Sequence, residues 1–154
     1  MNDERPVSED RPAVDVSLLL VRVIVGIIFA AHGAQKMFGA FGGIGLNAFV
    51  EMMGPIGYLV AIGEFFGGLG LVVGFLTRFS AASLIVIMLG AIFMVHGQHG
   101  FFLGQDPQAA GFEYNLALIG LLLPILIIGP GRYSIGRLFL PRSSRTGRPI
   151  IGLE

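Results

Sequence analysis

The stretch that decides the fold class runs from Leu18 to Phe38 and reads LLLVRVIVGIIFAAHGAQKMF. It is almost entirely apolar, and its length matches the ~20 residues that an α-helix needs to cross the hydrocarbon core of a bilayer. Three more apolar stretches follow, at about residues 56–76, 79–96 and 112–129. Because lipid offers no partner for backbone N–H and C=O groups, we expect all four stretches to be membrane-spanning α-helices.

The composition of the whole chain agrees with a membrane protein. Its 154 residues are 54% hydrophobic and only 13% charged, whereas a soluble domain carries roughly 25% charged residues. This balance excludes a disordered chain, a coiled coil and a nucleic-acid-binding protein with a basic face. The chain contains no cysteine, so it forms no disulfide, thiolate nucleophile, cysteine-ligated zinc site or iron–sulfur site. Any redox chemistry therefore needs a bound group or a partner that carries the electrons.

We predict an all-α fold: an integral membrane four-helix transmembrane bundle with a short interfacial helix at about residues 46–53, between the first two spans. Residues 1–16 are expected to form a flexible cytoplasmic N-terminal arm. Residues 17–140 would form the membrane domain, and residues 141–154 a polar cytoplasmic tail. The chain is thus expected to contain a single structured domain.

The positions of the basic residues predict the orientation of the bundle. With four spans, both termini and the turn between the second and third spans lie on the same side. That side holds nine of the ten Lys and Arg residues: Arg5, Arg11, Arg22, Arg78, Arg132, Arg137, Arg142, Arg145 and Arg148. The positive-inside rule makes this side cytoplasmic, so we expect an N-in, C-in protein of the plasma membrane.

Polar residues recur near the outer ends of the predicted spans. They are His32, Gln35 and Lys36 in the first span, Glu64 in the second, His96 at the end of the third, and Glu113 and Asn115 at the start of the fourth. At 1.5 Å per residue, His32 lies about 9 Å and Glu64 about 12 Å below the outer ends of their helices. Ionisable groups inside a span usually face the bundle interior and mark functional sites. The sequence therefore predicts a polar site in the outer half of the bundle.

Three residues of this site are candidates for chemistry. His32 and Lys36 could donate hydrogen bonds to the carbonyl groups of a quinone, and Glu64 could transfer protons. The candidates for ligand binding are Gln35, Phe65, His96, Glu113 and Asn115. An alternative stays open, in which Glu64 and Lys36 form a structural ion pair that fixes the helix register.

We expect no metal and no haem at this site. The two histidines that could ligate a haem, His32 and His96, differ in predicted depth by about 9 Å. Two other features are interpreted as structural. Gly63, Gly67, Gly70 and Gly74 fall on one helix face and favour close helix packing. Arg22 is expected to extend its side chain to lipid phosphates at the cytoplasmic surface.

Several short motifs, in order, carry a resemblance to a known family. They are Leu20-Val-Arg22-Val, Ala31-His-Gly-Ala-Gln-Lys36-Met-Phe38, Glu64-Phe-Phe-Gly-Gly68, Gly74-Phe-Leu-Thr-Arg78, His96-Gly97, Gly100-Phe-Phe102, Glu113-Tyr-Asn-Leu116 and Gly129-Pro-Gly-Arg-Tyr-Ser134. Over about residues 17–135 the chain resembles the DoxX family of small four-helix bacterial membrane proteins. The family often carries an Asp shortly after the last Ser, and Ile135-Gly136 stands there instead.

The resemblance implies a bacterial inner-membrane location and a redox role. The family takes its name from a subunit associated with a terminal quinol oxidase, and similar proteins are linked to thiosulfate:quinone oxidoreduction and to thiol and superoxide defence assemblies. We therefore expect a quinone-linked oxidoreductase or a subunit of a larger membrane redox complex. Quinone is the expected cofactor and membrane lipid an expected partner. The resemblance supplies no catalytic residue set, and the oligomeric state stays open.

Two other functions stay open beside this one. The chain could be a non-enzymatic membrane adaptor, an accessory subunit that scaffolds a larger complex, with its polar cluster serving only to fix helix register. It could also form a pathway for a small solute or protons, although no broken helix or inverted repeat marks it as a transporter.

Overall fold

The computed structural model describes residues 11–104 and 110–138, and within these residues every regular element is helical. The α-helices are α1 (Arg11–Phe38), α2 (Gly45–Met53), α3 (Ile56–Val73), α4 (Thr77–Ala91) and α5 (Glu113–Ile128). Among the described residues, three helical segments are long and apolar enough to cross a membrane, namely Pro12–Phe38, Ile56–Val73 and Thr77–His99. The described part of the chain is therefore all-helical and has the features of a membrane protein, as the sequence predicts.

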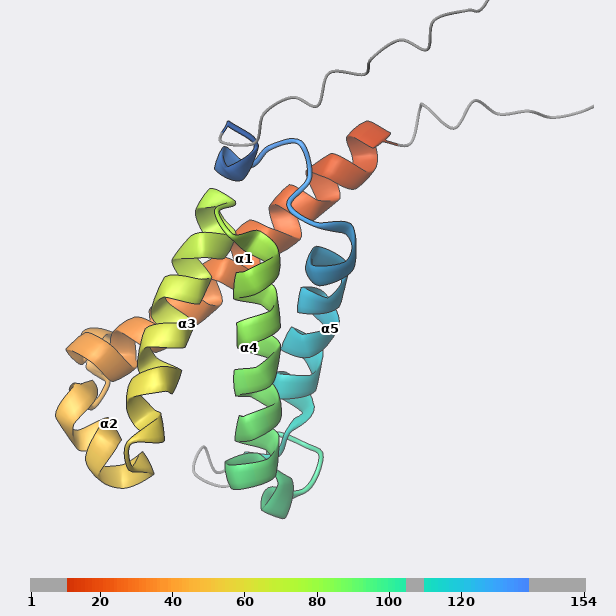
Figure 1. Ribbon diagram of the computed structural model, residues 1–154. Helices are drawn as coiled ribbons and strands as arrows, with labels where there is room; N and C mark the ends of the chain where they lie inside the picture. Colours follow the sequence, from red (N-terminus) through yellow and green to blue (C-terminus); the bar gives the residue numbers. More distant parts are fainter. Residues whose placement is uncertain (1–10, 105–109, 139–154) are drawn as a thin grey trace, which may run out of the picture.

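The helices form a bundle in which α1 crosses α3 obliquely and α4 runs beside both α3 and α5 (Figure 1). The start of α1, the turn from α3 to α4 and the end of α5 lie at one end of the bundle. The short helix α2 lies at the opposite end, beside the end of α1 and the start of α3. We call the end of the bundle that contains α2 the α2 end.

Some boundaries differ from those expected. Helix α1 begins at Arg11, so residues 11–16 extend the first helix instead of belonging to the arm. Helix α3 ends at Val73 because Gly74 adopts a left-handed conformation, with φ +76°, and closes the helix with a hydrogen bond to the carbonyl of Gly70. Helix α4 therefore starts at Thr77, two residues earlier than expected. Residues 1–10 and 141–154 lie outside the described residues.

The glycines of α3 provide close contact with α4, as the sequence predicts. A Cβ atom on Gly70 would lie 2.6 Å from Ser80 Oγ, and one on Gly63 would lie 2.7 Å from Ile87 Cδ1. Between them, a Cβ atom on Gly67 would lie within 3.2 Å of the side chain of Leu84. The two helices are thus in direct contact from the α3–α4 turn as far as Gly63.

A second glycine contact joins α3 to α1. A Cβ atom on Gly26 would lie 2.7 Å from the carbonyl oxygen of Gly68, so neither position tolerates a side chain. Small residues allow this approach of two backbones, which stabilises helix pairs in lipid through van der Waals contact. The apolar core lies between the helices and includes the buried side chains Val25, Phe29, Leu71, Leu84, Leu118 and Leu122.

The expectation that Arg22 extends its side chain to lipid phosphates was wrong. Its side chain is buried, with 2% of the residue exposed. The guanidinium donates hydrogen bonds to the backbone carbonyls of Pro130, at 2.8 Å, and Tyr133, at 2.5 Å. Gly74 makes room for it, because a Cβ there would lie 2.5 Å from Arg22 Nη1. Arg22 therefore holds the segment that follows α5 against the bundle.

Candidate functional site

A cavity of about 550 Å³ lies at the α2 end of the bundle, where its lining includes Phe49, Met52 and Met53 of α2. Its polar lining residues are His32 and Lys36 from α1, Glu64 from α3, His96 from the turn after α4, and Tyr114 and Asn115 from α5. Most of the other lining side chains are apolar, among them Met52, Met53, Met88 and Met94. This volume is within the ~300–1,000 Å³ of typical ligand sites, which also combine an apolar lining with a few polar groups.

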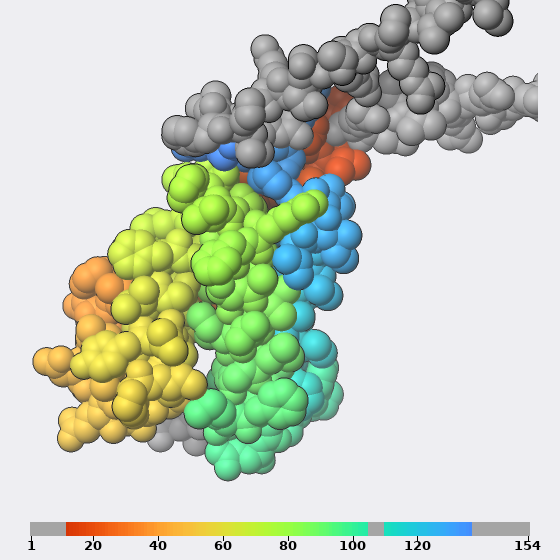
Figure 2. All heavy atoms as spheres, viewed as in Figure 1, coloured from red at the N-terminus to blue at the C-terminus, as the bar shows by residue number. Residues whose placement is uncertain are grey.

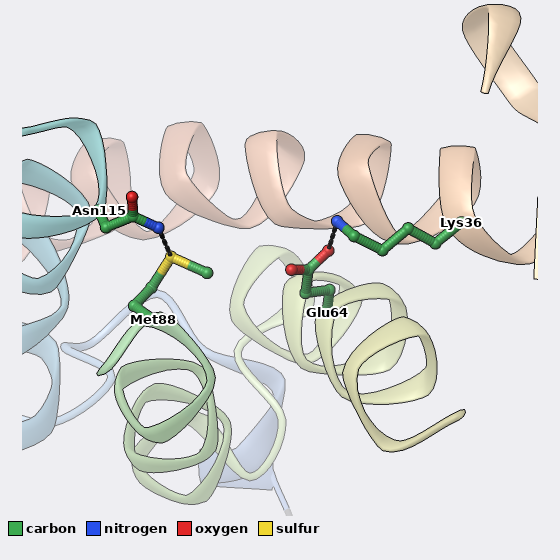
Figure 3. A network of polar contacts seen from close by, with 4 residues as sticks. All are labelled: Lys36, Glu64, Met88 and Asn115. Carbon is green, nitrogen blue, oxygen red and sulfur yellow. Dashed lines mark hydrogen bonds and ion pairs between the residues drawn. The ribbon is translucent and has the colours of Figure 1, made fainter. Parts of the chain in front are cut away.

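The ion pair between Lys36 and Glu64, drawn in Figure 3, lines the cavity. Lys36 Nζ donates a hydrogen bond to Glu64 Oε2 at 2.5 Å, which links α1 to α3. The Glu64 side chain is only 5% exposed, whereas that of Lys36 is 22% exposed. The ammonium also lies 5.7 Å from the ring centroid of Phe49 on α2. An ammonium carries three N–H donors, so Lys36 keeps donors for a ligand after pairing with Glu64.

Asn115 and Met88 form a second polar contact in the cavity wall. The buried Asn115 donates from Nδ2 to Met88 Sδ at 3.4 Å, which links α5 to α4. A thioether sulfur is a weak acceptor, so this bond holds the amide only weakly. In Figure 3 the Glu64 oxygen that does not bond Lys36 points toward the side of Met88. The ion pair and the amide thus belong to the same interior space.

His96 reaches the cavity because α4 continues into a π-helical turn at Ile92–His96. Such turns are rare and often occur at functional sites. Nδ1 of His96 lies 2.8 Å from the carbonyl oxygen of Ala110. A carbonyl only accepts hydrogen bonds, so Nδ1 carries a proton in this contact. In the neutral ring, Nε2 is then an acceptor.

His32 and Tyr114 meet in the same cavity. Their rings pack edge to face with centroids 6.4 Å apart, which joins α1 to α5. Tyr114 was not among the predicted site residues. Its position beside Asn115 in the first turn of α5, with a polar hydroxyl on an apolar helix, is the signal that could have identified it.

Three predicted binding residues do not line the cavity, and Gln35 and Phe65 are two of them. The backbone and Cβ of Gln35 lie directly beneath Gly43, where the chain folds back after α1. Phe65 packs edge to face against Phe38 and Phe66, at 5.2 Å in each case. Both residues therefore take part in packing of the α2 end outside the cavity.

Glu113 also lies outside the cavity and organises a loop. Its Oε1 accepts a hydrogen bond from the backbone N–H of Leu103 at 2.9 Å. The adjoining backbone is paired as well, with Gly111 N donating to Phe102 O at 3.0 Å. Of the eight predicted site residues, the structure thus brings together His32, Lys36, Glu64, His96 and Asn115.

No three histidine or carboxylate side chains gather as a metal site within residues 11–104 and 110–138. That the protein binds no metal and no haem at this site stays a prediction.

Comparison with known proteins places the chain in a family. The sequence profile of DoxX matches residues 17–97, more than half of the chain. The chain belongs to the DoxX family. The matched segment carries His32, Lys36, Glu64 and His96, whereas Asn115 on α5 lies beyond it.

Three similar proteins illustrate the breadth of this relationship. Inner membrane protein YqjF of Escherichia coli is 35% identical over 127 residues, which cover 80% of this chain and 92% of YqjF. Inner membrane protein YphA of the same organism is 32% identical and covers 79% of this chain and 89% of its own. A Bacillus subtilis protein named "Putative oxidoreductase CatD" is 33% identical and covers 72% of this chain and 79% of its own. No solved structure matches the chain.

Proposed function

We propose that this DoxX-family protein spans the bacterial plasma membrane four times, with both termini in the cytoplasm and the cavity in the outer half of the bilayer. Helix α5 is the proposed fourth span. Its 16 residues measure about 24 Å at 1.5 Å per residue. Arg78 supports its cytoplasmic end by donating from Nη2 to the carbonyls of Ile127, at 3.0 Å, and Ile128, at 3.2 Å. The distribution of basic residues and the names of YqjF and YphA support this placement.

We propose that the cavity binds the head group of a quinone and that the protein is a component of a membrane redox system. The observation that carries this proposal is the Lys36–Glu64 pair, with its buried carboxylate and partly exposed ammonium, in the lining of a mostly apolar cavity. A quinone head is a flat apolar ring with two carbonyl acceptors. The remaining Lys36 N–H groups and the Tyr114 hydroxyl supply matching donors, and the methionines supply adaptable apolar contacts. The name of CatD also supports a redox role.

When bound, a quinone supplies the capacity to take up two electrons and two protons. The residues of this chain would bind and orient the head group and hold protons beside it. Lys36 Nζ carries a proton at the cavity wall, and Glu64 keeps that ammonium in place. The chain has no cysteine, so a partner protein or a soluble reductant would deliver the electrons.

Direct binding measurements test the proposal. Purified protein in lipid nanodiscs is titrated with ubiquinone and menaquinone analogues that carry a short alkyl tail. We expect binding to the wild type and a loss of about tenfold in affinity for Glu64→Gln and for Lys36→Met. The matched control is Glu51→Gln, which changes an exposed carboxylate on α2 outside the cavity. A wild type that binds neither quinone would contradict the proposal.

A second function, that of a non-enzymatic membrane adaptor, is favoured by one observation. Glu64 is satisfied by Lys36 from a neighbouring helix, as expected of an ion pair that fixes helix register. In that case, a Lys36→Met, Glu64→Gln variant would still co-purify with the partner complex and support its activity. The redox proposal predicts that the complex assembles but loses quinone-dependent activity.

A further inference from the structure

We propose that ligands enter the cavity sideways from the outer leaflet of the membrane, through an opening between α3 and α4. The inference rests on the proposed quinone function and specifies its substrate class, a membrane-resident quinone whose apolar tail lies in this opening. The cavity-lining residues that we assign to this side opening are Ile56, Leu59 and Val60 on α3, Val86 and Gly90 on α4, and Met94 in the π-helical turn that follows α4.

The opening arises because α3 and α4 separate toward the α2 end. Of the α3 glycines that contact α4, Gly63 lies nearest the α2 end, against Ile87. Beyond it, the facing side chains line the cavity instead of packing against one another. Figure 2 shows the result as a gap between the atoms of α3, in yellow, and those of α4, in green. On α4 the lining residues Val86 and Gly90 are four positions apart and so share one helix face, and Met94 follows in the π-helical turn.

The surroundings of the opening suit an acyl or isoprenoid chain. Leu59 is 71% exposed and Val86 is 67% exposed, on opposite sides of the gap. Both helices belong to candidate membrane spans, so these side chains face lipid. The Lys36–Glu64 pair also lines the cavity, on the interior side of α3. A ligand with a polar head and an apolar tail therefore matches the cavity with its head inside and its tail in the gap.

Gly90 is the residue at which this route can be closed without disturbing the fold. A Cβ atom on Gly90 would meet no atom within 4 Å, although Gly90 lines the cavity. A leucine there would fill the side opening. Gly120 on α5 provides a matched control, because a Cβ there also meets nothing within 4 Å and the residue does not line the cavity. Both substitutions replace a helical glycine with a better helix former, so both variants should fold.

The experiment compares wild type, Gly90→Leu and Gly120→Leu in lipid nanodiscs. Each protein is titrated with two quinones that share one head group, of which one carries a decyl tail and the other has none. We expect Gly90→Leu to lose at least tenfold in affinity for the decyl quinone and less than threefold for the tail-less one. Gly120→Leu should bind both as wild type does. Thermal melting of the three proteins verifies that they are folded.

Each of the other outcomes contradicts the proposed side opening, and each does so for a different reason. If Gly90→Leu binds the decyl quinone as tightly as wild type, the tail does not lie between α3 and α4, while the quinone function stands. If Gly90→Leu loses both ligands equally, leucine occupies the position of the head group and the tail route is wrong. If wild type binds neither quinone, the proposed function fails and this inference fails with it.

Discussion

Replacing Lys36 by methionine should destabilise the protein more than replacing its partner Glu64 by glutamine. The two side chains share one hydrogen bond, but Glu64 is 5% exposed and Lys36 is 22% exposed. Removing Lys36 leaves a nearly buried carboxylate, which must stay unpaired or take up a proton. Removing the charge of Glu64 leaves an ammonium that is partly exposed and that can still donate to the amide oxygen of glutamine.

The magnitudes follow from this asymmetry. Breaking a buried ion pair by removing one partner costs roughly 3–5 kcal/mol. The partial exposure of Lys36 places the cost of Lys36→Met near the lower limit, at about 3 kcal/mol. The cost of Glu64→Gln should be about 1 kcal/mol, typical of a weakened hydrogen bond. The double variant should be no less stable than Lys36→Met alone, which corresponds to a coupling energy of about 1–2 kcal/mol.

The assay is equilibrium unfolding of the four proteins in mixed micelles, with the helical circular dichroism signal as the measure of the folded fraction. The free energies of unfolding give a complete double-mutant cycle. Additive losses, with a coupling energy below about 0.5 kcal/mol, would refute the reasoning. So would a Lys36→Met variant that is as stable as Glu64→Gln.

Three more predictions concern residues outside the ion pair. Arg22→Ala removes two charge-assisted hydrogen bonds and should lower the free energy of unfolding by about 3 kcal/mol in the same micelle assay, while Arg22→Lys restores less than half of the loss. Gly68→Leu should prevent the contact of α1 with α3 and lower the melting temperature strongly, whereas Gly120→Leu leaves it within a few degrees; equal melting temperatures would contradict the packing described. Glu113→Gln should lower the free energy of unfolding by about 1 kcal/mol, because it weakens one loop hydrogen bond. Because Glu113 lies outside the cavity, this variant should keep its quinone affinity within twofold of wild type in a nanodisc titration.

The sequence predicts how deep the site residues lie in the bundle better than it predicts the direction in which their side chains point. Depth depends only on helix start, helix direction and a rise of 1.5 Å per residue. This reasoning brings together His32, Lys36 and Glu64 from helices that run in opposite directions. The structure places all of them in one cavity, together with His96 and Asn115.

The direction in which a side chain points depends on how its helix is rotated about its own axis, and packing against neighbouring helices determines that rotation. Phe65 follows Glu64 directly, so it lies about 100° away around the helix and packs against Phe38 instead of the cavity. Gln35 lies beneath the returning chain at Gly43, a fold-back that the sequence does not reveal. The π-helical turn that positions His96 has no recognisable sequence signal either.

The burial of Arg22 has a similar origin. An isolated helix would extend this side chain to the membrane surface. In the folded protein, the segment after α5 returns over the bundle and offers the carbonyls of Pro130 and Tyr133. A partner more than 100 residues away in the chain cannot be inferred from the span that carries the arginine.

Photochemical crosslinking in native membranes tests the central claim, that the cavity binds a quinone, most directly. A quinone analogue with a diazirine near its head group is irradiated in membranes that contain the protein, and the modified peptides are identified by mass spectrometry. We expect modification within residues 29–36, 86–96 and 110–118, which contain cavity-lining segments from three sides, and its suppression by excess unlabelled quinone. Modification confined to the lipid-exposed surface, or not reduced by the competitor, would contradict the account.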